Sequence, residues 1–200
     1  MIWLVSTALA HPFETDEYSY RTELKASDKG LVGLVVLEIP ITKVLEGIGV
    51  EDGDSKMAKR KKADAFTEGV YSTMAAGLTV TLDGAAHPVE WRPPVTEMNG
   101  KAAEGFFLYM VSFHTPLDEL PAEGYSVAVS NAGYPDEPMV YSGGVGASEP
   151  WTVTTSTAHT LLGEDRSASV TDEARWSRDD AFRQFSATFA RPSGPGPQDP

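Results

Sequence analysis

Cysteine is absent from this sequence of 200 residues. Disulfide bonds, thiolate nucleophiles and thiolate metal ligands are therefore excluded, and a metal ion would need imidazole, carboxylate or terminal groups as ligands. Long apolar runs are absent too, because no stretch reaches the roughly 18 residues that a membrane-spanning helix needs. These residues are therefore predicted to contain no membrane span.

Basic residues are scarce relative to acidic ones. The sequence has 16 Lys and Arg against 29 Asp and Glu, which gives a formal net charge of −13. Such a charge repels nucleic acid and anionic lipid, and it attracts cations. We therefore expect no nucleic-acid partner. The 41% of hydrophobic and 22% of charged residues are typical of a globular protein.

The first ten residues, MIWLVSTALA, are mostly apolar and end in Ala8-Leu9-Ala10. An apolar stretch followed by an A-x-A site is typical of a secretory signal peptide, although the usual basic start is missing here. The alternative is a buried first strand of the mature domain. We predict a signal peptide over 1–10 and therefore an extracytoplasmic protein, either periplasmic or secreted.

Alternating apolar and polar side chains dominate the chain after residue 16. Residues 17–26 alternate as a half-buried strand does, and the β-branched stretch 31–39 comes after the turn Asp28-Lys29-Gly30, so a hairpin is expected. Residues 182–189 fit a helix and a strand equally well. Further strands are expected at 78–82 and, across an Asp83-Gly84 hairpin turn, at 89–91, and also at 106–114, 125–129, 139–142 and 151–157. Short strands separated by such turns predict a mainly β fold, an immunoglobulin-like β-sandwich.

One inserted α-helix is predicted at about 57–76. Its apolar positions recur at helical spacing, with Asp54 or Ser55 as the N-cap and Gly77 at the end. The residues of this apolar face are Ala63, Phe66, Val70 and Met74. A single helical turn is also expected near 42–47. The basic run 59–62 lies outside the apolar face and is interpreted as a solvated helix surface.

The remaining organisation is simple. The domain is predicted to cover 11–191, with a disordered Pro- and Gly-rich tail at 192–200.

The glycine-rich segment 143–146 lacks the third glycine and the helix of a phosphate-binding loop, so we expect a flexible loop between strands. The acidic segment 51–54 fails the EF-hand spacing and is interpreted as a solvated turn. The G-x-S-x-G, H-E-x-x-H and P-loop signatures are missing, which favours a non-enzymatic protein.

His11 is the strongest candidate for a metal ligand in this sequence. If cleavage occurs after Ala10, the mature chain begins with His11, whose α-amine and imidazole can together chelate Cu(II), Ni(II) or Zn(II). Pro12 has no backbone N–H, so binding through successive deprotonated amides is blocked. The candidates for a second imidazole ligand are His114 and His159, whereas His87 is not considered a ligand. The alternative is a histidine that merely comes after the cleavage site, with the others as polar strand-end residues.

Several segments together suggest a family. They are His11-Pro12, Glu38-Ile39-Pro40, Asp52-Gly53-Asp54, the stretch 77–84, Trp151-Thr152-Val153-Thr154 and the stretch 169–173. In their order and spacing, the sequence resembles the extracytoplasmic domain that precedes the membrane helices in nickel/cobalt-permease-like proteins of the hydrogenase/urease accessory type. Members of that family continue into several transmembrane helices, which these 200 residues lack. The resemblance implies a periplasmic or extracellular domain that handles a transition metal for a membrane transporter.

Three functions are compatible with these observations. The first is an exported, non-enzymatic domain that binds Cu or Ni for a membrane partner. The second is a copper-dependent oxygenase with an N-terminal histidine brace, which needs a second histidine close to His11. The third is a structural or adhesive β-sandwich without a cofactor. The position of His11 relative to a second imidazole would distinguish the first two from the third.

Overall fold

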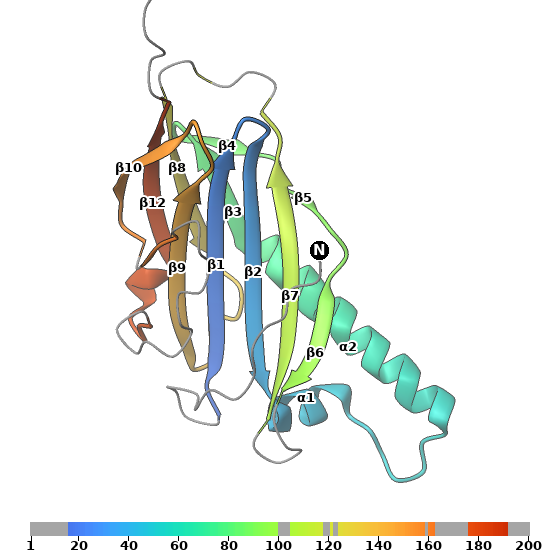
Figure 1. The fold of residues 1–200 in the computed structure, drawn as a ribbon. Helices are drawn as coiled ribbons and strands as arrows, with labels where there is room; N and C mark the ends of the chain where they lie inside the picture. The colour runs from blue at the N-terminus through green and yellow to red at the C-terminus, as the bar shows by residue number, and fades with distance from the viewer. Residues whose placement is uncertain are drawn as a thin grey trace, which may run out of the picture.

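The computed structural model describes residues 16–99, 105–117, 121, 124–158, 160–162 and 176–191. The protein is mainly β, with two sheets and two α-helices in this part of the chain (Figure 1). The predicted signal peptide at 1–10 and the predicted tail at 192–200 lie outside the described residues. Among the described helices, none is long and apolar enough to span a bilayer.

The larger sheet begins with the predicted hairpin, which is confirmed. Its two strands pair antiparallel, from Ser19 opposite Glu38 to Ser27 opposite Gly30. The strands of this sheet are β1 (Tyr18–Ser27), β2 (Gly30–Pro40), β5 (Glu90–Trp91), β6 (Val95–Asn99), β7 (Phe106–Thr115), β9 (Met139–Ala147) and β11 (Thr160–Leu161). Their order is β11-β9-β1-β2-β7-β5, with β6 also paired to β7. The β1–β9 pair is parallel.

The smaller sheet has the order β10-β12-β8-β3-β4. Its strands are β3 (Leu78–Leu82), β4 (Ala85–His87), β8 (Gly124–Asn131), β10 (Thr152–Ser156) and β12 (Gln184–Ala190). The ambiguous segment 182–189 is thus mostly strand. A short 3-10 helix, η2 (Asp180–Arg183), precedes it. The strand is favoured because Phe185, Ala187 and Phe189 are all buried at alternate positions.

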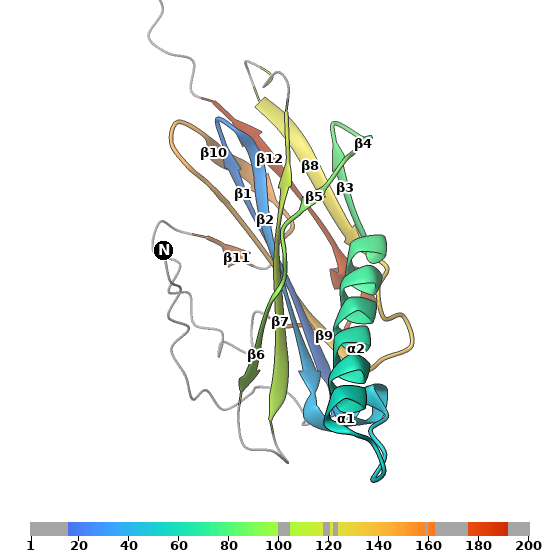
Figure 2. The same ribbon diagram turned by 90° about the vertical axis from the view of Figure 1, so that its right-hand side faces the viewer.

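The two sheets form a β-sandwich whose core lies between their inner faces (Figure 2). From the larger sheet, the core includes Leu24, Val35, Tyr109 and Phe113. From the smaller sheet, it includes Val80, Val127 and Phe189. The prediction of a mainly β sandwich is therefore confirmed, and the immunoglobulin-like arrangement of its strands stays a prediction.

The prediction of a flexible loop at Gly143–Gly146 was wrong, because these glycines lie inside β9. A Cβ atom on Gly143 would lie 2.7 Å from the ring of Phe185, on the facing sheet. On Gly144 and Gly146 it would lie 3.0 Å from side-chain atoms of Leu162. The glycines therefore make room for neighbouring side chains on both faces of a buried strand.

The predicted hairpin over 78–91 is only partly correct. The Asp83-Gly84 turn is confirmed, with positive φ values of 47° and 82°. The strand that returns from it is β4, and β5 pairs with β7 in the larger sheet instead. Pro88 lies between β4 and β5 and has no N–H to donate, which is consistent with the ladder ending there.

The predicted helix is confirmed as α2 (Lys56–Gly77), with Ser55 as the N-cap residue. The Ser55 hydroxyl accepts a hydrogen bond from the Ala58 N–H at 3.2 Å. Of the predicted apolar face, Val70 and Met74 are buried and Phe66 is partly buried against the core. The single turn expected at 42–47 is longer than predicted and forms α1 (Ile41–Ile48).

Candidate functional site

Of the predicted metal ligands, only His114 belongs to the described residues, since His11 and His159 lie outside them. His114 is the penultimate residue of β7. In the ladder, it lies opposite Val32 of β2 on one side and opposite Glu90 of β5 on the other. The edge strand β5 therefore places a carboxylate beside this imidazole.

The imidazole of His114 contacts two groups. Its Nε2 lies 2.8 Å from the backbone carbonyl oxygen of Lys29, and its Nδ1 lies 3.8 Å from Oε2 of Glu90. A carbonyl oxygen only accepts hydrogen bonds, so Nε2 carries the proton and donates. In the neutral ring, Nδ1 is then the nitrogen with the free lone pair, and Oε2 of Glu90 lies 3.8 Å from it.

The turn between β1 and β2 positions the Lys29 carbonyl. Gly30 has a φ of 105°, in the region that favours glycine. A Cβ atom on Gly30 would lie 2.5 Å from the Thr115 carbonyl oxygen and 3.4 Å from Nε2 of His114. Glycine therefore lets the turn approach the end of β7 closely enough for the Lys29–His114 hydrogen bond.

This pair offers one nitrogen and one oxygen ligand to a cation. The side chain of His114 is 27% exposed and that of Glu90 is 69% exposed, so both are accessible. Among the described residues, no group of three or more His, Asp and Glu side chains is arranged to hold a metal ion. A metal bound at His114 would therefore take its further ligands from solvent or from residues outside the described part.

His87, which was not expected to be a ligand, lies in the other sheet. It is on β4, opposite Val80 of β3. Its Nδ1 is buried and has no hydrogen-bond partner within the described part of the chain. In the strand ladder, His87 is therefore paired with neither an acidic residue nor His114.

The acidic segment 51–54 forms the solvated turn that was predicted. Oδ2 of Asp54 accepts hydrogen bonds from the Glu51 N–H at 2.9 Å and from Nζ of Lys62 at 2.8 Å. The backbone hydrogen bond and then the lysine lower the pKa of Asp54. The Asp54 carboxylate therefore already accepts hydrogen bonds from two groups of the protein.

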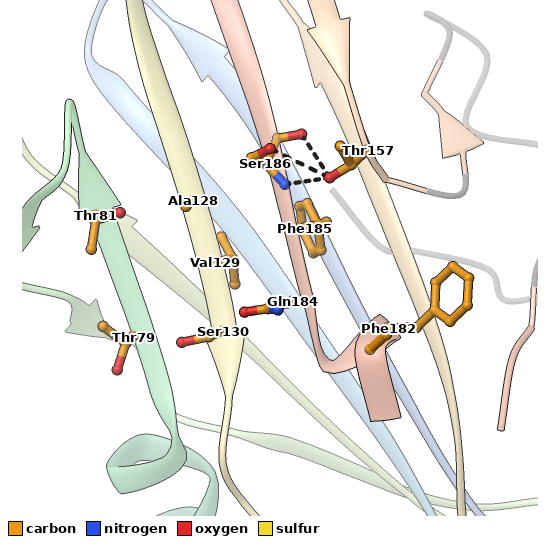
Figure 3. Close-up of a pocket in the computed structure, with 11 residues that line it drawn as sticks. Thr79, Thr81, Ala128, Val129, Ser130, Thr157, Phe182, Gln184, Phe185 and Ser186 are labelled. Atoms are coloured by element: carbon orange, nitrogen blue, oxygen red, sulfur yellow. Dashed lines mark hydrogen bonds between the residues drawn. The ribbon is translucent and has the colours of Figure 1, made fainter. Parts of the chain in front are cut away.

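A groove that sequence reasoning missed lies on the outer face of the smaller sheet (Figure 3). Its volume is about 520 Å³, and β3, β8, β12, η2 and Thr157 contribute its lining. The lining residues are Thr79, Thr81, Ala128, Val129, Ser130, Thr157, Ala181, Phe182, Gln184, Phe185 and Ser186. None of these side chains is ionisable, so the groove offers hydrogen bonds but no general acid or base.

The hydroxyl groups of the groove partly bond to one another. The Ser186 N–H donates to Oγ1 of Thr157 at 2.8 Å, and the two side-chain oxygens are 3.4 Å apart (Figure 3). The alternation that places Ser126, Ala128 and Ser130, and likewise Gln184, Ser186 and Thr188, on one face is the signal that could have revealed this surface. These contacts favour a rigid polar surface over a reactive centre.

No family model matches the sequence, and no curated protein matches it. The residues and their geometry are therefore the basis for assigning a function.

Proposed function

We propose that the protein is an exported, non-enzymatic domain that binds a divalent transition metal, Cu(II) or Ni(II), and presents it to a membrane partner. The observation that carries the proposal is the orientation of His114. Its Nε2 donates a hydrogen bond to the Lys29 carbonyl at 2.8 Å, and its Nδ1 lies 3.8 Å from the Glu90 carboxylate.

A histidine that ligates a metal through one ring nitrogen usually donates its other N–H to a carbonyl or a carboxylate. The Lys29 carbonyl plays this part for His114, because it fixes the tautomer and the ring orientation. Nδ1 and Oε2 of Glu90 are 3.8 Å apart. The two atoms would offer one nitrogen and one oxygen ligand to a metal ion after small side-chain movements.

Two ligands alone bind a metal weakly, so the proposal includes the mature N-terminus. Cleavage after Ala10 would leave His11 with a free α-amine beside its imidazole, a chelating pair that suits Cu(II) and Ni(II). The net charge of −13 raises the local concentration of cations. The resemblance to nickel/cobalt-permease-like domains supports a membrane transporter as the partner.

The test is calorimetric titration of the mature protein, beginning at His11, with Cu(II) and with Ni(II). We expect His114→Ala and Glu90→Gln each to weaken binding by more than about tenfold, since even an outer-shell change costs that much. A version extended by one Met before His11 should also bind more weakly, because the amine moves away from the imidazole.

His87→Ala is the matched control and should bind as the unaltered protein does. Thermal melts of each variant would confirm that the fold is retained. Absence of binding in the mature protein would overturn the proposal. Unchanged affinity in both His114→Ala and the Met-extended form would also overturn it.

A further inference from the structure

A second candidate surface for an interaction lies on the two helices. We define the helical tip as residues 45–62, which comprise the end of α1, the connecting loop and the start of α2. The buried residues of α2 are Val70, Met74 and Gly77, all in its second half. Its first half extends beyond the sheets, as the turquoise helix shows (Figure 1).

Within the helical tip, positive charge is concentrated at the start of α2. Five of the 16 basic residues of the chain fall between positions 56 and 62, with no acidic residue among them. Lys62 is held by Asp54 and by the Gly49 carbonyl, both at 2.8 Å. The other basic residues, Lys56, Lys59, Arg60 and Lys61, are exposed. In a protein of net charge −13, this cluster is a local reversal of sign.

These basic residues are unfavourable for the helix itself. The N-terminal end of a helix carries a partial positive charge, and acidic residues stabilise its first turn. The first turn of α2 contains no acidic residue. Lys62 is paired with Asp54, but the second ion pair on this stretch, Arg60 to Asp64, is long at 4.0 Å and lies at the surface. Basic residues that disfavour the helix, and of which only Lys62 is held by close partners in the described part of the chain, point to an interaction with another molecule.

Apolar side chains accompany the cations on the same tip. Met57 is 82% exposed, Leu45 is 59% exposed and Val50 is 44% exposed. Basic residues next to exposed apolar residues are the chemistry of attachment to an anionic membrane surface. The cations attract the headgroups, and the apolar side chains enter the interface.

We propose that the helical tip docks on an anionic phospholipid surface. A protein partner fits less well, because Lys is depleted from protein interfaces and this cluster carries no aromatic side chain. The acidic remainder of the protein does not prevent docking. Charges separated by more than about 8 Å are largely screened at physiological salt, and α2 is about 33 Å long. Four acidic residues, Glu46, Glu51, Asp52 and Asp54, also lie within the tip and reduce its attraction for an anionic surface. Asp54 is paired with Lys62.

The experiment is co-sedimentation of the protein with vesicles of phosphatidylcholine alone and with an equal mixture of phosphatidylcholine and phosphatidylglycerol. We expect binding to the mixed vesicles only, and weaker binding as salt is added. The double variant Lys59→Glu, Lys61→Glu should partition at least about tenfold more weakly. Met57→Ala should also weaken binding.

The matched control is Arg92→Glu with Arg191→Glu, which changes the net charge equally at two exposed residues outside the tip. This control should bind as the unaltered protein does. The tip variants should keep or raise the melting temperature, because acidic residues suit the start of a helix. No binding to the mixed vesicles would overturn the proposal and favour an acidic protein partner. Equal losses in the tip variant and in the control would overturn it as well.

Discussion

The ring of Phe113 on β7 lies over Gly33 on the neighbouring strand β2. The two residues are directly paired in the ladder, and a Cβ atom on Gly33 would lie 2.0 Å from Cζ of Phe113. The buried ring also packs on Trp91 of β5, with centroids 5.3 Å apart. The absence of a side chain at position 33 is therefore what allows the aromatic cluster at this end of the core.

Gly33→Ala is expected to lower the free energy of unfolding by about 1–3 kcal/mol, because the new methyl group overpacks the core. Urea unfolding would measure it. The control is Gly69→Ala in α2, where an added Cβ would have no heavy atom within 4 Å. That change should stabilise the protein by about 0.5–1 kcal/mol, since alanine is the better helix former. A Gly33→Ala protein as stable as the original would show that the ring of Phe113 lies elsewhere.

Phe66 joins the two helices to the larger sheet. A Cβ atom on Gly47 of α1 would lie 2.5 Å from the Phe66 ring, which also packs edge-on against Phe107 at 6.4 Å. Phe66→Asp should lower the free energy of unfolding by about 2–4 kcal/mol, because it removes this packing and places a charge there. Thermal melts would measure the change. Ala65→Asp, at an exposed position one residue earlier, should cost only about 0.5–0.7 kcal/mol, the difference in helix propensity. Equal melting temperatures for both variants would contradict the contact.

Local patterns were sufficient to predict the β1–β2 hairpin and α2. The alternation in 17–26 and the Val70 and Met74 spacing are short-range signals, and each element agrees with them. The glycines of β9 were misread because their partners are distant in sequence. Phe185 fills the space at Gly143, and a glycine inside a buried strand looks locally like a loop.

The candidate site was predictable only in its residue types. His114 was recognised as a possible ligand, but its partners were not, because Lys29 and Glu90 reach it through two different strand pairings. The groove on the smaller sheet combines β3, β8 and β12, which are separated by long stretches of chain. Side chains that come together only because their strands pair in a sheet have no characteristic spacing in the sequence, so the sequence alone does not reveal them.

Export with cleavage after Ala10 is a further prediction, from the apolar leader and the Ala8-Leu9-Ala10 site. N-terminal sequencing of the protein purified from its native host should give His11 as the first residue. Ala10→Arg should slow or abolish processing, because the cleavage site requires a small residue. A chain that begins at Met1 and is recovered from the cytoplasm would contradict both export and the terminal metal ligand.

Tyr20 and Tyr141 are neighbours on the parallel strands β1 and β9, and both are buried. Within the described part of the chain, neither hydroxyl has a hydrogen-bond partner. Burial raises the pKa of Tyr141 to about 12, and it also raises the pKa of Tyr18 and of Tyr134 to about 12. The folded protein therefore keeps these phenols protonated at a pH where the unfolded chain ionises them.

This difference in tyrosine pKa between the folded and unfolded states determines whether the free energy of unfolding rises or falls with pH. Unfolded tyrosines lose their protons above a pH of about 10, so the stability that the raised pKa values contribute is complete below about 10. It is lost as the pH rises through about 12, because the unfolded state binds fewer protons. We expect the free energy of unfolding to fall by up to about 1 kcal/mol per shifted tyrosine between pH 9 and 11.

Tyr141→Phe separates this effect from general alkaline damage. At neutral pH the variant should be as stable as the original protein or slightly more so, because it removes a buried hydroxyl without a partner in the described part of the chain. The ring that Arg183 covers at 4.8 Å is retained. Between pH 9 and 11 the variant should lose less stability than the original in urea titrations, since one shifted phenol is gone. Identical losses in the two proteins would show that Tyr141 ionises as readily in the folded state as in the unfolded chain.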